Sequence, residues 1–367
     1  MKRRFQGLLA SLSAAVLVTT SFAADAPKGL EQSGKPDLKS AGPLAFGPEG
    51  VLLVGDPQGA ALFAIGVPAS KSKPGEGVKI EKIDEKVAAL LGTKAADILI
   101  NDLAVQPGSG DAYLSVSRGR GPDAEAVIVK IDSKGEVSAV SLDKVNYAKV
   151  AISNAPDASQ KDRRGNSLRQ ESITDLAYVD GKIYVAGLSN EEFASTMRVL
   201  NFPFTSADTS TAIEIYHGAH GQFETRAPVR TFTPFMFGGE PHLLAAYTCT
   251  PLVKLPLSEM KPGAKLRGTT IAELGNRNRP LDIVAYEKDG KTYLLLANSA
   301  RGVMKIATDK IEGQEGITEK IADKAGVGYE TVAELQGVEH LDRLGEDQAL
   351  LLVRSGDVLS LQSVALP

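Results

Sequence analysis

Short apolar runs recur along the chain, and turns rich in Gly, Asp and Asn separate them. The clearest copy has an apolar run at 281–286, a turn at Asp289-Gly290 and a second apolar run at 292–297. Related units lie at 43–56, 102–131, 175–186 and 339–354. Short runs bounded by turn residues are typical of β-strands rather than helices. The pattern therefore predicts a repeated β unit.

A sixth copy is disguised. The segment 228–247 aligns with the clearest copy when one inserted residue is allowed, and Arg230 then takes the position of Asp282. Helical periodicity is confined to 81–91, which predicts one short helix within an insertion. The polar stretch 142–172 is interpreted as a long loop, with a seventh repeat in this stretch as the alternative.

Repeated four-stranded units indicate an all-β fold. An isolated unit cannot bury both of its apolar faces, so the units are expected to close into a ring. The prediction is a single domain over residues 24–367, a six-bladed β-propeller with loop insertions and one short helix. The last unit lacks an obvious outer strand, and we expect residues 24–40 to supply it and close the ring.

The first residues have the features of a secretory signal peptide. Lys2 to Arg4 are basic, 8–18 is apolar, and small residues precede a predicted cleavage after Ala23. Export through the general secretory route would place the mature chain in the periplasm or outside the cell. Cleavage removes three cations and no acids, so the net charge changes from −4 to −7. No later stretch is long and apolar enough to span a membrane, and no basic stripe indicates a nucleic-acid partner.

The repeat register gathers polar residues at one end of the ring. In a propeller the first strand of each blade lines the axis, and the loops entering these strands open on one face. The residues predicted to bind a ligand on this funnel face are Asp102, Arg118, Asp175, Arg230, Asp282, Asn298 and His340. The alternative is that the repeated Asp side chains hydrogen-bond the backbone of the next blade. Carboxylates this close repel one another, so we expect a cation among them, either Arg230 or a bound ion such as Ca²⁺.

A second cluster is predicted near the junction of the third and fourth blades. His217 and His220 are separated by two small residues, and the only cysteine, Cys249, is expected on the same face. Together, or with Glu224, they form a candidate zinc or copper site. The alternative is two polar loop histidines and a cysteine buried as a small apolar residue. A single cysteine excludes both an internal disulfide and covalent c-type haem.

The units at 175–186 and 281–294 resemble the repeats of bacterial NHL, YVTN and gluconolactonase-like propellers. The resemblance covers nearly the whole mature chain and implies the fold, but these families include binders, scaffolds and enzymes. Gluconolactonase-like hydrolases hold a divalent metal on the axis, and Asp282 matches one of their ligands. Their Asn ligand is not matched. Quinoprotein dehydrogenases carry characteristic tryptophans, and because this chain has none, PQQ is not expected.

Three functional hypotheses follow. The first is an exported propeller that binds a small ligand, a metal or a periplasmic protein at its funnel face, with no catalysis assigned. The second is a metal-dependent lactone or ester hydrolase. The third is a periplasmic copper- or zinc-handling or redox-associated protein. The sequence leaves open whether the chain is an enzyme.

Overall fold

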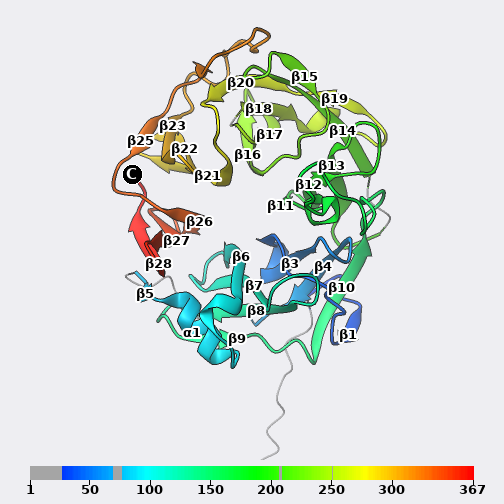
Figure 1. Cartoon of the computed structure of the whole chain (residues 1–367), viewed down its shortest axis with the longest axis vertical. Coiled ribbons are helices and arrows are strands. Elements are labelled where there is room, and N and C mark those ends of the chain that lie inside the picture. Colours follow the sequence, from blue (N-terminus) through cyan, green and yellow to red (C-terminus); the bar gives the residue numbers. More distant parts are fainter. Residues whose placement is uncertain (1–26, 69–76, 206–208, 250) are drawn as a thin grey trace, which may run out of the picture.

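The computed structural model describes residues 27–68, 77–205, 209–249 and 251–367. Six β-sheets surround a central axis as the blades of a propeller (Figure 1). The sequence prediction of six blades is confirmed, and 142–172 holds no seventh blade, because β10 (Val145–Ala151) joins another sheet. The predicted signal peptide, 1–23, lies outside the described residues.

Each blade is named here by its innermost strand. The β2 blade contains β2 (Leu44–Phe46), β3 (Val51–Asp56), β4 (Ala61–Gly66), β10 and the short β1 (Gln32–Gly34). The β6 blade contains β6 (Ile98–Val105), β7 (Ala112–Arg118), β8 (Glu125–Ile131) and β9 (Val137–Ala139). The β11 blade contains β11 (Asp175–Val179), β12 (Lys182–Leu188), β13 (Ser195–Asn201), β14 (Thr209–His217), β15 (Gln222–Glu224) and β19 (Lys265–Arg267).

The remaining three blades follow in chain order. The β16 blade contains β16 (Thr231–Phe237), β17 (Glu240–Ala246), β18 (Pro251–Pro256), β20 (Thr269–Leu274) and β24 (Lys324–Gly326). The β21 blade contains β21 (Pro280–Lys288), β22 (Lys291–Asn298), β23 (Gly302–Ala307) and β25 (Glu330–Val332). The β26 blade contains β26 (Val338–Leu344), β27 (Gln348–Ser355), β28 (Val358–Ala365) and β5 (Lys79–Glu81).

The order of blades around the ring differs from their order in the chain. The innermost strands contact one another in the order β2, β11, β16, β21, β26, β6 and back to β2 (Figure 1). The second blade in the chain is thus inserted between the first and the last. The chain leaves the β2 blade before it is complete, builds the β6 blade, and returns to add β10 beside β4.

The ring is closed by an internal strand, not by the N-terminal segment as predicted. β5 pairs antiparallel with β28, which supplies the missing outer strand of the last blade. In the segment 24–40, the strand β1 pairs with β10 at the outer edge of the first blade. The expectation for 24–40 was therefore wrong, because β5, on the chain path from the β2 blade to the β6 blade, occupies the edge of β28.

Hydrophobic burial accounts for the ring. Among the described residues, one apolar cluster fills each of the six interfaces between neighbouring blades. In β3, Leu52 and Val54 pack toward the β6 blade while Val51 and Leu53 pack toward the β11 blade. Because both faces of such a strand are covered, its sequence is a continuous apolar run.

The one α-helix among the described residues agrees with the predicted one. It is α1 (Ile83–Leu90), and its Ile83, Val87 and Ala88 pack on the interface between the β26 and β6 blades. Four short 3₁₀ segments complete the helical content of the described chain: Pro48–Gly50, Ala95–Asp97, Leu168–Glu171 and Leu257–Glu259. In this part of the chain, no helix has the length and apolarity needed to cross a membrane.

Candidate functional site

Aspartates on the innermost strands join neighbouring blades. Asp102 Oδ2 accepts the backbone N–H of Leu44 at 2.6 Å, and Asp175 Oδ2 accepts that of Phe232 at 2.7 Å. Each acceptor lies one blade before its donor in the same direction around the ring. The alternative of the sequence analysis, hydrogen bonding to the next blade, is thus what the structure has at these positions.

Two further aspartates continue this pattern. Asp282 Oδ2 accepts the N–H of Leu341 at 3.0 Å, and Asp342 Oδ2 accepts the N–H of Val105 at 2.7 Å. The sequence analysis did not select Asp342, although the repeated Leu and Asp residues of the first strands were visible there. Burial, opposed by these hydrogen bonds, raises the pKa of Asp342 to about 7.

His340 lies between two of these carboxylates and supplies the cation. Its Nδ1 is 3.0 Å from Asp282 Oδ2 and 3.5 Å from Asp102 Oδ1. Burial lowers the pKa of His340, but the two carboxylates outweigh that effect and raise it to about 10. Arg230 does not play this part, because its guanidinium pairs with Glu171. A counter-charge is therefore available from His340, a residue from which the sequence analysis did not expect it.

A cavity of about 960 Å³ opens on one side of these aspartates. We call it the funnel cavity. Six of the seven predicted ligand-binding residues line it: Asp102, Asp175, Arg230, Asp282, Asn298 and His340. A second cavity of about 470 Å³ is lined by three of the same residues, Asp102, Asp175 and Asp282. Its lining also includes Gln106, Tyr178 and Arg343. The two cavities therefore share these aspartates in their linings.

The seventh predicted residue lies elsewhere. Arg118 ends β7 and pairs with the exposed Glu125 at 3.0 Å, away from the funnel cavity. Conversely, Arg279 lines the cavity and was not selected from the sequence. Arg279 directly precedes β21, in a loop whose residues lack a counterpart in the repeat alignment, so the repeat gave no indication of it.

The predicted metal cluster is brought together from three elements. His217 ends β14, His220 lies in the turn before β15, and Cys249 lies between β17 and β18. One ligand atom from each of the three lies within 4.8 Å of the other two. Cys249 adopts a left-handed backbone conformation, with φ of 65°, and donates its N–H to Asn278 O at 2.7 Å. The backbone is therefore fixed where the thiol joins the histidines.

Glu224 orients both imidazoles. Its carboxylate lies 2.9 Å from His217 Nδ1 and 2.5 Å from His220 Nδ1. Burial alone would raise the pKa of Glu224, but the two histidines lower it to about 2. An imidazole that donates from Nδ1 keeps an unprotonated lone pair at Nε2, the arrangement found behind histidines that bind metals.

Two polar atoms near this cluster lack partners. His217 Nε2 and Glu273 Oε2 are both buried without a hydrogen bond to any described residue. The other oxygen of Glu273 accepts the N–H of Gly218 at 2.6 Å, and burial raises the pKa of Glu273 despite the nearby histidines. A buried acceptor without a donor costs about 1–3 kcal/mol, so these two atoms are exceptions among the polar groups of the cluster.

Comparison with known proteins gives no family assignment. No model of a protein family and no curated protein matches the chain. The propeller fold is confirmed by the structure, whereas the resemblance to NHL, YVTN and gluconolactonase-like families therefore stays a prediction.

Several solved structures are similar at a low level. A putative oxidoreductase (glucose dehydrogenase) of Thermus thermophilus has 13% identity and a TM-score of 0.36 over 91% of this chain and 99% of its own. A PQQ-bound aldose sugar dehydrogenase of Streptomyces coelicolor has 13% identity and a TM-score of 0.30, covering 91% and 96%. The extracellular region of plexin A4 has 8% identity and a TM-score of 0.42, covering 91% and 51%. Likenesses this low assign no cofactor, so the expectation about PQQ stays untested.

Proposed function

We propose that this propeller binds a zinc or copper ion through His217, His220 and Cys249. The observation that carries the proposal is the buried, unpartnered Nε2 of His217 beside a second histidine and a thiol, with both rings oriented by Glu224. Two imidazole nitrogens and one thiolate form a donor set suited to zinc or copper and unsuited to calcium or magnesium.

Charge supports the same proposal. Glu224, whose pKa the two histidines lower to about 2, carries a negative charge beside His217 and His220, which favours a cation at this cluster. Three protein ligands leave a coordination position for water, substrate or a further side chain, which is the arrangement of catalytic zinc centres. The site therefore suits metal handling, and it leaves room for chemistry at the metal.

Export would be a further argument for a functional role of Cys249. We propose that residues 1–23 direct the chain to the periplasm or the outside, where an unpaired cysteine is uncommon unless it has a role. A metal ligand is such a role. The axial hydrolase is not proposed, because Asp102 and Asp282 already accept backbone N–H groups and flank His340.

Elemental analysis of the purified mature protein tests the proposal. We expect one zinc or copper ion per chain after loading with either metal under reducing conditions, and no stoichiometric ion in Cys249→Ser or His217→Gln. The matched control is His242→Gln, because the fourth histidine lies outside the cluster and packs edge-on against Phe237. Circular dichroism establishes that the variants are folded. Absence of both metals from the wild type, or full occupancy in Cys249→Ser and His217→Gln, would overturn the proposal.

A further inference from the structure

The funnel cavity carries a second binding function, independent of the metal cluster. We propose that Arg279, supported by Arg230, binds the carboxylate or phosphate group of a small organic anion. The proposal rests on an unpaired cation inside a cavity of molecular size. It requires no metal, and it does not depend on the cluster at Cys249.

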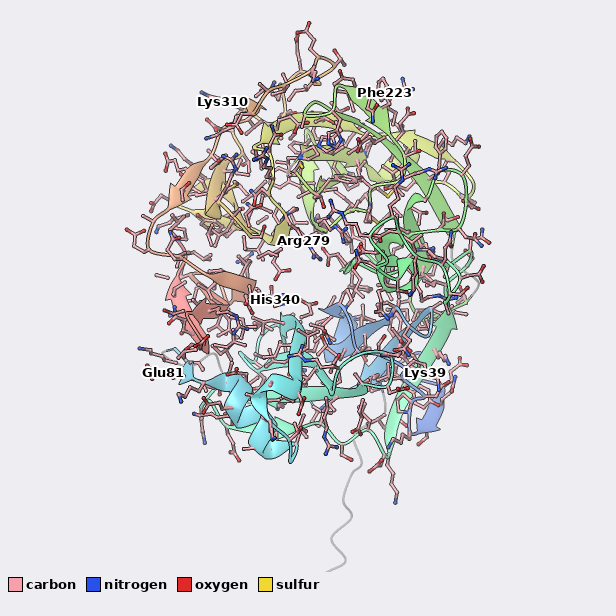
Figure 2. All side chains as sticks on the ribbon, in the orientation of Figure 1. Lys39, Glu81, Phe223, Arg279, Lys310 and His340 are labelled. Carbon is pink, nitrogen blue, oxygen red and sulfur yellow. The ribbon has the colours of Figure 1, made fainter. Side chains whose placement is uncertain are left out.

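The backbone of Arg279 is fixed while its charged end is free. Its N–H donates to Ser299 Oγ at 3.0 Å, and its carbonyl accepts the N–H of Ser299 at 2.9 Å. Its guanidinium has no hydrogen bond or ion pair with any described residue. Figure 2 shows Arg279 at the inner edge of the ring, and Arg279 and His340 line the same cavity from the neighbouring β21 and β26 blades. The five N–H donors of this side chain are therefore available inside the funnel cavity.

The charges around Arg279 favour an anion. Burial in the funnel and the nearby charge of Arg230 lower the pKa of Arg279. Glu171 opposes this effect, but its carboxylate is already paired with Arg230. Glu171 thus pairs with Arg230, and the guanidinium of Arg279 has no acidic partner among the described residues. An oxyanion placed between the two guanidiniums would relieve the repulsion and accept charge-assisted hydrogen bonds.

The other charged residues of the cavity are already paired. Arg354 is bound by Glu339 through two nitrogens, at 2.5 Å and 3.1 Å. Asp102 and Asp282 share the single positive charge of His340 and accept backbone N–H groups. Asp175, whose pKa burial raises well above its usual value, accepts the N–H of Phe232. The wall also carries Asn298, whose Oδ1 is buried without a partner. The guanidinium without a charged partner is therefore that of Arg279.

The size of the cavity identifies the class of ligand. A volume of about 960 Å³ is that of a site for a small organic molecule rather than for an inorganic ion. The expected ligand has one carboxylate or phosphate group for Arg279 and an uncharged polar body. Its charge would make binding weaken as salt is added.

Calorimetric titration of the mature protein tests this assignment. The protein is first treated with EDTA and dialysed, so that an ion at Cys249 does not contribute. The probes are gluconate, which has one carboxylate, and glucose 6-phosphate, with glucose as the uncharged control. We expect saturable binding of at least one anion and none of glucose. The two anions distinguish a carboxylate site from a phosphate site.

Substitutions then locate the site. Arg279→Gln is expected to lower the affinity for the anion at least about tenfold, because the charged hydrogen bonds from the guanidinium are lost. Arg118→Gln is the matched control, because Arg118 lies outside the cavity, and binding should be unchanged. Cys249→Ser should also bind the anion normally, which separates this proposal from the metal site. Failure of both anions to bind, or equal binding by Arg279→Gln, would overturn it.

Discussion

The propeller contains two clusters of acidic groups and histidines. They differ in whether their polar atoms have hydrogen-bond or ionic partners. At the axis, His340 lies between Asp102 and Asp282, and both carboxylates also accept backbone N–H groups from the next blade. The predicted metal cluster of His217, His220 and Cys249 is called the outer cluster here. In it, the carboxylate of Glu224 contacts only the Nδ1 atoms of the two histidines. The axial cluster is therefore complete, whereas the outer one has free lone pairs.

The comparison shows that distance alone does not identify a metal site. Each cluster brings three potential ligand atoms within 4.8 Å of one another. At the axis these atoms hold blades together and neutralise one another. In the outer cluster His217 Nε2 is buried without a partner. Buried polar groups in folded proteins are normally paired, so the unpaired atom is the informative one.

The largest expected effect is the loss of the axial imidazolium. We predict that His340→Gln lowers the free energy of unfolding by about 3 kcal/mol at pH 6, because two buried carboxylates lose their counter-charge. The pKa of His340 is raised from 6.5 to about 10 in the folded protein. A raised pKa stabilises the fold fully below pH 6.5, and this contribution disappears as the pH rises to 10.

Chemical denaturation at a series of pH values measures this effect. The difference between wild type and His340→Gln should narrow steadily between pH 6.5 and pH 10. His242→Gln is the control, and its difference from the wild type should not follow this course. Metal content should be the same in all three proteins. A difference for His340→Gln that does not change with pH would show that the imidazolium does not stabilise the axis.

A smaller effect is expected from the carboxylate behind the outer cluster. Glu224→Gln retains the shape of the side chain but loses the charge that holds both Nδ1–H groups. Changes to such supporting residues typically cost 10- to 100-fold in metal affinity, so we expect a loss in this range with the stoichiometry unchanged. Competition with a chelator of known affinity measures it. An unchanged affinity would mean that Glu224 does not orient the ligands.

The sequence predicted the blades better than their arrangement. Each blade has long apolar inner strands, and their pattern is local, so six repeats and the helix were visible. The ring order depends on β5 and β10, which pair with strands far away in the chain. β5 has three residues, and no local pattern identifies its partner. The closing strand was therefore predicted in the wrong segment.

The candidate sites divide in the same way. His217, His220 and Cys249 were predicted as a group because loops at one end of a propeller converge, and the structure places them together. Arg118 was misplaced, because the end of a strand does not fix the direction of an exposed side chain. Arg279 was missed because irregular loops carry no repeat register. The pairing of His340 between two blades depends on tertiary contacts that the sequence does not display.

The smallest expected effect, at Asp175, tests whether the axis is complete without an added cation. Burial raises the pKa of Asp175 well above its usual value, with further contributions from Asp102 and Asp282, so its negative charge is disfavoured. Asp175→Asn retains an oxygen for the N–H of Phe232 but turns its amide nitrogen toward the N–H of Leu176, which Oδ1 accepts at 2.7 Å, so it should change the free energy of unfolding by about 1 kcal/mol. Asp175→Leu leaves both N–H groups without this acceptor and should cost more, about 2–3 kcal/mol.

Urea denaturation of both Asp175 variants, with and without added calcium, distinguishes the two interpretations of the axis. If hydrogen bonding between blades is the role of Asp175, Asn substitutes for Asp, Leu does not, and calcium has no effect on any of the proteins. If instead Asn is as costly as Leu and calcium stabilises only the wild type, the negative charge itself is required. The axis would then be a cation site like the outer cluster, and the contrast between a complete and an incomplete cluster would fail, because His340 would not be its only counter-charge.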